Sequence, residues 1–172
     1  MYISLSRPVD LDLRIVEGFV EHARRRRLSA AARLITRAGN GWLYGAAALF
    51  LLFWYGRSVV AAAVSLIVAF LVYPPLKRFV ARPRPCHHAA HLADALQPLD
   101  RYSFPSGHAM TAAAFGVPIA VAAPAPAALI VVAGCALVSW SRVALGHHYL
   151  SDVVAGTILG AAIAAGVALF VL

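Results

Sequence analysis

Long apolar runs separated by short polar segments make up most of the chain, and they predict helices along most of its length. Five runs stand out, at residues 41–55, 58–73, 109–123, 127–145 and 153–172. Their lengths approach the roughly 20 residues that a helix needs to cross a bilayer. Each run is therefore predicted to be a membrane-spanning helix.

The first two runs are separated only by Gly56 and Arg57. One unbroken helix would be too long for a bilayer and would hold Arg57 at mid-depth, where a charge costs roughly 2.5–3.5 kcal/mol. We therefore predict a helical hairpin that turns at this point. Pro74 and Pro75 are predicted to end its second helix, because proline removes a backbone donor.

The N-terminal segment, residues 9–38, has apolar side chains at helical intervals, with acidic residues early and arginines late. That order of charges suits the helix dipole. The segment carries too many charges to span a bilayer, so we predict an amphipathic helix at the membrane interface. A flexible basic tail is the alternative. The polar segment 77–105 is predicted to be a loop over one end of the bundle, because its backbone would lack hydrogen-bond partners in lipid.

The predicted fold is all-α: a polytopic membrane helix bundle of about five transmembrane helices plus an N-terminal amphipathic interfacial helix. It forms a single domain over residues 1–172, with 1–40 as the interfacial helix and 41–172 as the transmembrane core. Composition agrees, since 62% of the 172 residues are hydrophobic and soluble domains are nearer half. The net charge of +8 would suit nucleic acid in a soluble protein. In so apolar a chain, lipid phosphates and anionic membrane lipids are the expected partners instead. The oligomeric state stays open.

Three polar patches, at residues 77–85, 104–110 and 141–152, fall on one side of the membrane if the chain crosses it five times. Arg142 and Asp152 are the only formally charged side chains after Ser103. Asp152 follows His148 by four residues, so on a helix the two would share a face, and the carboxylate could hold one imidazole tautomer. A buried ion pair with helix-capping groups is the alternative.

The patches also supply the cations Lys77, Arg84 and Arg142, with Ser106 and Gly107 at a predicted helix N-terminus. Guanidinium groups and N-terminal amides bind tetrahedral oxyanions. A glycine beside them lets the backbone approach a ligand.

Two histidines, His108 and His148, would divide the roles of general acid and nucleophile. Asp152 is the lone acid near these patches, so no Mg²⁺ site, and no cofactor, is predicted. Fixed cations would stabilise the developing charge instead.

In order, the patches resemble the three-part signature of the type 2 phosphatidic acid phosphatase (PAP2) superfamily. The matching residues are Lys77, six residues, Arg84-Pro85; then Pro105-Ser106-Gly107-His108; then Ser141-Arg142, five residues, His148, three residues, Asp152. The resemblance implies that His148 is the nucleophile that forms a phosphohistidine, oriented by Asp152. It also implies that His108 protonates the leaving alkoxide and later activates water. The phosphoryl oxygens would be bound by Lys77, Arg84, Ser106, Gly107 and Arg142.

The activity implied is that of a small bacterial membrane lipid phosphatase, metal-independent, acting on a lipid phosphate or diphosphate monoester. Phosphatidate, phosphatidylglycerophosphate, prenyl or undecaprenyl diphosphate and lipid A phosphate stay open as substrates. The alternatives are a vanadate-dependent haloperoxidase-like enzyme and a non-catalytic membrane protein.

Several other polar residues have weaker interpretations. His147 is a minor alternative to His148 as nucleophile. Cys86 with His87, His88 and His91 could suggest a metal site, but the spacing is loose and favours a solvated loop. A disulfide between Cys86 and Cys135 is improbable from their positions. Arg78 and Arg82 could touch lipid headgroups, and ordinary interfacial arginines without a headgroup role are the alternative.

The side of the membrane that carries the site is indicated in two opposite ways. Bacterial members of the family mostly face the active site to the periplasm, so the resemblance implies a periplasmic site in the inner membrane. Nearly all Lys and Arg lie on the predicted site side, and the opposite side shows Arg57. The positive-inside rule would then favour the cytoplasm. We adopt the periplasmic side, because the chemistry requires some of those cations.

Overall fold

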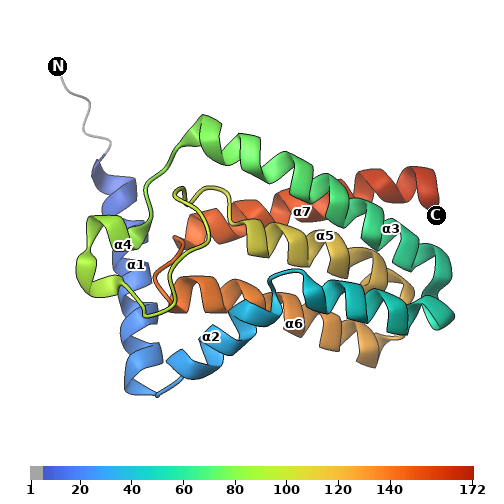
Figure 1. Ribbon diagram of the computed structural model, residues 1–172, viewed down its shortest axis with the longest axis horizontal. Coiled ribbons are helices and arrows are strands. Elements are labelled where there is room, and N and C mark those ends of the chain that lie inside the picture. Colours follow the sequence, from blue (N-terminus) through green and yellow to red (C-terminus); the bar gives the residue numbers. More distant parts are fainter. Residues whose placement is uncertain (1–5) are drawn as a thin grey trace.

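A computed structural model describes residues 6–172 as a bundle of helices (Figure 1). Residues 1–5, part of the predicted interfacial segment, lie outside the described residues. The elements are α1 (Ser6–Arg25), α2 (Ser29–Ala38), α3 (Trp42–Val80), α4 (Pro85–His88), the 3-10 helix η1 (Ala90–Leu92), α5 (Gly107–Ala122), α6 (Ala125–Ala144) and α7 (Leu150–Val171). No strand occurs within 6–172, so the all-α prediction is confirmed for that range.

Helix α3 is a hairpin of two helical arms. Gly56 has φ 14° and ψ −91°, which is far from helical geometry, and the chain reverses direction there (Figure 1). Residues from both arms, among them Tyr44 and Val59, belong to one hydrophobic cluster. The side chain of Arg57 donates to the carbonyl of Val171 at 2.8 Å and 3.1 Å, at the end of α7. The turn predicted at Gly56 is confirmed.

The second arm of α3 does not end at Pro74 and Pro75; it continues to Val80. That prediction is wrong. Proline is tolerated within membrane helices where neighbouring groups satisfy the freed backbone. The extra turns matter for the site, because they place Lys77 on a helix that points toward the polar end of the bundle.

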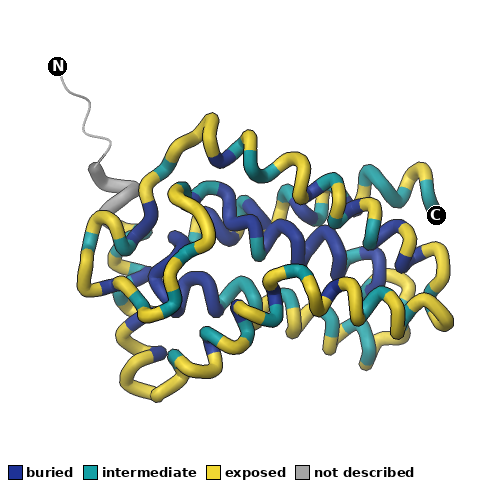
Figure 2. The backbone as a smooth tube through the Cα atoms, viewed as in Figure 1, coloured by how far each residue is buried: buried dark blue, intermediate teal, exposed yellow. Residues whose placement is uncertain are grey.

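Helix α5 is the centre of the bundle, and it packs against α3, α6 and α7. Most of α5 is buried (Figure 2). Many of its buried residues are small, including Ala109, Ala112 and Ala114, beside the larger Met110, Phe115 and Ile119. A Cβ atom added at Gly156 would lie 2.5 Å from the carbonyl oxygen of Ser106, and one at Gly160 would lie 2.2 Å from that of Met110. The two glycines of α7 therefore permit its close approach to α5, as small residues spaced by four do in membrane helices.

The large apolar side chains point outward instead. Phe53, Leu129, Ile130 and Phe170 are mostly exposed, and Figure 2 shows the outer faces of the helices as exposed. Three helical stretches are long and apolar enough to cross a membrane, namely Trp42–His88, Ala125–Ala144 and Leu150–Val171, and α5 is a shorter apolar helix. Small residues inside and large apolar residues outside are typical of an integral membrane bundle.

The N-terminal segment is two helices, so the prediction of one helix over 9–38 is wrong. The chain breaks between α1 and α2, where Arg27 has a φ of 56°. The apolar face of α1, with Val16 and Val20, packs against Val143 and Tyr149 at the polar end of the bundle. This face is therefore buried against protein. An interfacial position for the segment stays a prediction.

Candidate active site

A cavity of about 80 Å³ lies at the polar end of the bundle. It is lined by Gly39, Asn40, Phe70, Tyr73, Lys77, Arg84, Leu99, Asp100, Gly107, His108, Thr111, Arg142 and His148. Six of the eight predicted site residues are among them. The other two lie just behind the wall: Ser106 precedes α5, and Asp152 contacts His148. The tertiary structure thus brings all three polar patches to one place.

His148 lies in the short connection between α6 and α7 and is buried. Its Nε2 is 3.1 Å from Nη1 of Arg84. A guanidinium only donates hydrogen bonds, so Nε2 accepts, and the proton of a neutral ring belongs on Nδ1. That Nδ1 faces Oδ2 of Asp152 at 3.5 Å, which is longer than a hydrogen bond.

The environment keeps His148 neutral. Burial, and then the nearby charges of Arg84 and Arg142, hold the pKa of His148 well below its ordinary value. A neutral ring with its lone pair on Nε2 has the form that a nucleophilic histidine requires.

His147 faces elsewhere. Its Nε2 lies 2.7 Å from the carbonyl oxygen of Leu96, and it does not line the cavity. Burial, with the charge of Arg142, lowers the pKa of His147 to about 3. The geometry therefore favours His148 over His147 as the reactive imidazole.

Asp152 lies in the first turn of α7, which begins at Leu150. Its Oδ2 accepts from the backbone N–H of Tyr149 at 2.9 Å, as part of a capping box. Because His148 precedes the helix, the two side chains do not share a helical face, and that premise of the prediction is wrong. They approach each other through the turn that caps the helix.

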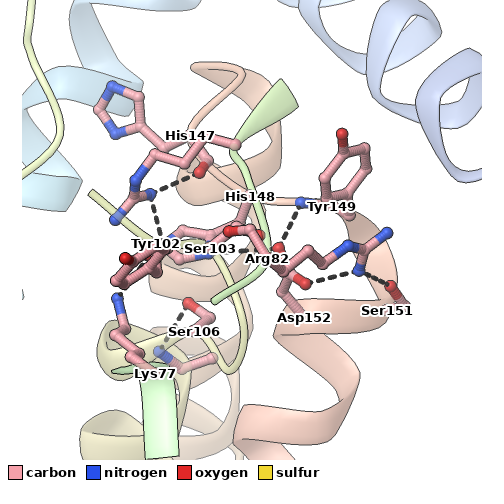
Figure 3. A network of polar contacts seen from close by, with 12 residues as sticks. Lys77, Arg82, Tyr102, Ser103, Ser106, His147, His148, Tyr149, Ser151 and Asp152 are labelled. Atoms are coloured by element: carbon pink, nitrogen blue, oxygen red, sulfur yellow. Dashed lines mark hydrogen bonds and ion pairs between the residues drawn. The ribbon is translucent and has the colours of Figure 1, made fainter. Parts of the chain in front are cut away.

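Arg82 supplies the counter-ion of Asp152 (Figure 3). Its Nη1 donates to Oδ1 of Asp152 and to Oγ of Ser151, both at 2.7 Å, and its Nη2 donates to Asp12 at 2.9 Å. The guanidinium also lies 3.8 Å from the ring centre of Tyr149. The interpretation of Arg82 as a headgroup contact is therefore wrong. A buried carboxylate requires a partner charge. The position of Asp152 within an apolar part of the sequence was therefore a signal that a cation such as Arg82 lies beside it.

Asp100 is a second carboxylate at the site, so the prediction that Asp152 is the lone acid nearby is also wrong. Its Oδ2 lies 2.7 Å from Nζ of Lys77, and its Oδ1 lies 2.6 Å from Nη2 of Arg84. Burial alone would raise the pKa of Asp100, but the hydrogen bond and charge of Lys77, together with Arg84, bring it below its ordinary value.

Arg142 lies in the last turn of α6 and is buried at the cavity wall. Its Nη1 donates to Oγ1 of Thr36 at 3.1 Å, and this hydroxyl lies 2.7 Å from Oγ of Ser141. Thr36 belongs to α2, so the N-terminal segment helps to position a predicted phosphate ligand. The sequence alone contained no spacing signal for that contact.

The first turn of α5 forms another part of the wall. Oγ of Ser106 accepts from the N–H of Ala109 at 3.5 Å. The backbone N–H of Ser106 donates to the backbone carbonyl of Asp152 at 3.0 Å. Helix N-termini carry unsatisfied N–H groups that favour anions, and Gly107 and His108 line the cavity there. Nε2 of His108 is 2.7 Å from Oδ1 of Asn40, a contact the sequence did not indicate.

Within the described part of the chain, no group of three or more His, Cys, Asp or Glu side chains could hold a metal ion. Cys86 and the histidines that follow it therefore do not assemble a metal site. Both cysteines are free thiols.

Comparisons with known proteins agree with one another. A family model described as the PAP2 superfamily matches residues 58–172. Decaprenylphosphoryl-5-phosphoribose phosphatase of Mycobacterium tuberculosis is 36% identical over 109 residues, which are 63% of this chain and 59% of the relative. Undecaprenyl-diphosphatase of Sulfolobus acidocaldarius is 32% identical over 116 residues, which are 66% of this chain and 55% of the relative. The chain thus matches little more than half the length of these relatives.

Two solved structures share the fold. The PAP2-type phosphatidylglycerolphosphate phosphatase of Bacillus subtilis has a TM-score of 0.77 at 24% identity, covering 98% of this chain and 88% of the other. Aquifex aeolicus LpxE has a TM-score of 0.80 at 23% identity, covering 92% and 94%. At these identities the likeness concerns the arrangement of the helices.

Proposed function

Because the chain belongs to the PAP2 superfamily, we propose that it is an integral membrane lipid phosphatase that hydrolyses a lipid phosphate or diphosphate monoester. One observation carries the proposal. A neutral His148, with Asp152 behind it, opens onto the same cavity as the cations Lys77, Arg84 and Arg142. A nucleophile beside converging cations is the arrangement that phosphoryl transfer requires.

In the first step, the cations bind the phosphoryl oxygens and Nε2 of His148 attacks phosphorus. The bond between phosphorus and the lipid oxygen breaks, and His108, which enters this step in its protonated form, gives its proton to the departing alkoxide and becomes neutral. The product is a phosphohistidine whose ring keeps its proton on Nδ1. Asp152 stabilises the positive charge that the ring acquires.

In the second step, His108 accepts a proton from water, and the resulting hydroxide attacks the phosphohistidine. The P–N bond breaks, inorganic phosphate leaves, and His148 returns to its neutral form. Lys77, Arg84 and Arg142 stabilise the developing charge in both steps. Their effect is strengthened because the site is buried and water screens it less than at the surface.

The lipid part of the substrate has an apolar path to the cavity. Phe70, Tyr73 and Leu99 line its wall, and Phe70 and Leu99 are also exposed at the outer surface. A hydrocarbon chain that enters here would stay in contact with apolar side chains while its phosphate reaches the cations.

We place polyprenyl phosphates and diphosphates first among the substrates, since two of the similar relatives are named for prenyl-linked substrates. Phosphatidylglycerophosphate and lipid A phosphate come next.

The test is phosphate release by the purified protein from a panel of these lipids and phosphatidate. Release from at least one, lost in His148→Ala and His108→Ala, is expected. His147→Gln, a neighbouring buried imidazole outside the cavity, is the matched control and should keep most activity. Normal turnover in His148→Ala would refute the assigned roles.

We further propose five membrane crossings, by the two arms of α3 and by α5, α6 and α7, with the site facing the periplasm. Some of the arginines on the site side, whose number would favour a cytoplasmic site under the positive-inside rule, have a structural role. Arg24 donates to the carbonyls of His91 and Ala93 at 2.8 Å and 3.1 Å, and Arg33 pairs with Asp94 at 3.1 Å. A cysteine placed beside Arg57, at the opposite end, should resist labelling by an impermeant thiol reagent in intact cells. Labelling from outside would mean a cytoplasmic site.

A further inference from the structure

Asp100 lines the cavity and contacts two of the cations to which the proposed function assigns the phosphate. It is the one carboxylate among the described residues that line the cavity. Its two oxygens are divided between Lys77 and Arg84, at 2.7 Å and 2.6 Å. Under the proposed function these two cations bind phosphoryl oxygens. The carboxylate therefore uses the same donors as the substrate.

The donors of Arg84 are almost fully engaged. Its Nε donates to the carbonyl of Asp100 at 2.9 Å, and its Nη1 contacts the carbonyl of His147 at 2.5 Å and Nε2 of His148 at 3.1 Å. Its Nη2 donates to the Asp100 carboxylate. A guanidinium has five N–H donors, so a bidentate contact with a phosphoryl group requires one partner to leave.

The Asp100 carboxylate is the partner best placed to leave. Its side chain is 40% exposed, whereas those of Lys77 and Arg84 are 6% and 1% exposed. It lies in the connection between η1 and α5, which has no regular secondary structure. Two of the other contacts of Arg84 are backbone carbonyls, and the third is the imidazole.

Charge favours the same exchange. Lys77, Arg84 and Arg142 bring three positive charges to the cavity, and Asp100 brings one negative charge. The net charge of two matches a terminal phosphate dianion. Without Asp100, three buried cations would repel one another in the substrate-free protein.

We propose that Asp100 is an internal carboxylate ligand that holds Lys77 and Arg84 until a phosphate displaces it. The inference rests on the proposed function, because it assigns the same cations to the substrate. Phosphate monoester dianions displace the carboxylate because two charges replace one. A phosphodiester monoanion brings only one charge and therefore displaces the carboxylate less readily.

The test compares Asp100→Asn with the wild-type full chain, purified in detergent. Binding of inorganic phosphate is measured by calorimetry, and KM is measured for the best lipid phosphate of the panel. Asp100→Asn should bind phosphate about tenfold more tightly, equivalent to ~1.4 kcal/mol, and its KM should fall. Dimethyl phosphate, a diester monoanion, should gain affinity as well. Equal or weaker phosphate binding would mean that Asp100 supports the cations, which overturns the proposal.

Asp94→Asn is the matched control, since it removes the same charge from the same connection. Asp94 pairs with Arg33 and does not line the cavity, so its phosphate affinity should not change. A similar gain in Asp94→Asn would show that loosening of the loop is the cause, against the proposal. Asp100→Glu, which keeps the charge, should bind phosphate within about threefold of wild type.

Stability gives a second measurement on the same proteins. Asp100→Asn should unfold at a lower temperature than wild type without phosphate, and added phosphate should raise its midpoint more than that of wild type. Because phosphate binding is measured without turnover, the two proposals fail separately. A tenfold gain in a protein that hydrolyses no lipid phosphate supports this inference and overturns the proposed function. Hydrolysis of a lipid phosphate, without a gain in phosphate affinity in Asp100→Asn, supports the proposed function and overturns this inference.

Discussion

Replacing Arg82 by methionine is the perturbation that most directly tests how the site is supported. The variant keeps the length and apolar stem of the side chain and removes its charge. Among the described residues, it leaves Asp152, which is fully buried, with no partner cation, because the nearby His148 is neutral. Breaking a buried ion pair by removing one partner costs about 3–5 kcal/mol. Arg82 is 22% exposed, so water screens the pair in part, and we expect about 3 kcal/mol.

The cost should appear both in stability and in turnover. For a chain of this size, about 3 kcal/mol lowers the thermal midpoint by roughly 10 °C. Asp152 would reduce the cost by taking up a proton or turning away, and either change weakens its support of the Nδ1 proton of His148. A small misplacement of a catalytic group can reduce turnover by about 10²-fold. We expect kcat to fall by that order, with a much smaller change in KM, because Arg82 does not line the cavity.

The assay combines thermal unfolding in detergent with phosphate release from the best substrate. Arg82→Lys should recover part of both losses, because it restores the charge but not the simultaneous contacts with Asp152, Ser151 and Asp12. Arg78→Met, an exposed position of the same segment, is the control and should resemble wild type. In Asp152→Asn, adding Arg82→Met should cost far less than it does in wild type. If Arg82→Met behaves like Arg78→Met in both assays, the inferred role of Arg82 is wrong.

Two further predictions concern pH and packing. His147 and His148 stay neutral when folded, because their pKa values lie below the ordinary value, whereas the unfolded chain takes up protons below about pH 6.5. Thermal stability should therefore fall as the pH drops from 7 to 5, by up to ~1.4 kcal/mol per pH unit for each histidine. His147→Gln should flatten this dependence, and a slope unchanged by the substitution would contradict the argument. Gly156→Ala would place a Cβ atom 2.5 Å from the carbonyl of Ser106, and we expect it to cost roughly 1–3 kcal/mol and to lower activity by moving the start of α5. Gly166→Ala, where an added Cβ meets nothing within 4 Å, is the control; equal stability of the two variants would show that the α5–α7 contact is not tight.

The apolar pattern was sufficient to predict the helices of the membrane core and the turn at Gly56. Apolar runs with few charges have few alternatives to helix in a bilayer. Proline was the main source of error. Its effect on a helix depends on what surrounds the freed backbone, and this explains why α3 continues past Pro74 and Pro75. The break between α1 and α2 was also missed, because the helical spacing of apolar residues persists across it.

The sequence by itself indicated six of the residues that line the cavity, because they fall in polar patches that five predicted crossings bring to one side of the membrane: Lys77, Arg84, Gly107, His108, Arg142 and His148. Only the tertiary structure decided how those residues are supported. Arg82 neutralises Asp152, Thr36 contacts Arg142, and Asp100 holds Lys77 and Arg84. Each partner comes from a segment that is distant in the sequence from the residue it contacts. Whether the two side chains meet depends on how the helices pack, which their spacing in the sequence does not specify. Short-range spacing identifies the groups to which the proposed function assigns the chemistry, whereas long-range packing selects the charged partners that surround those groups.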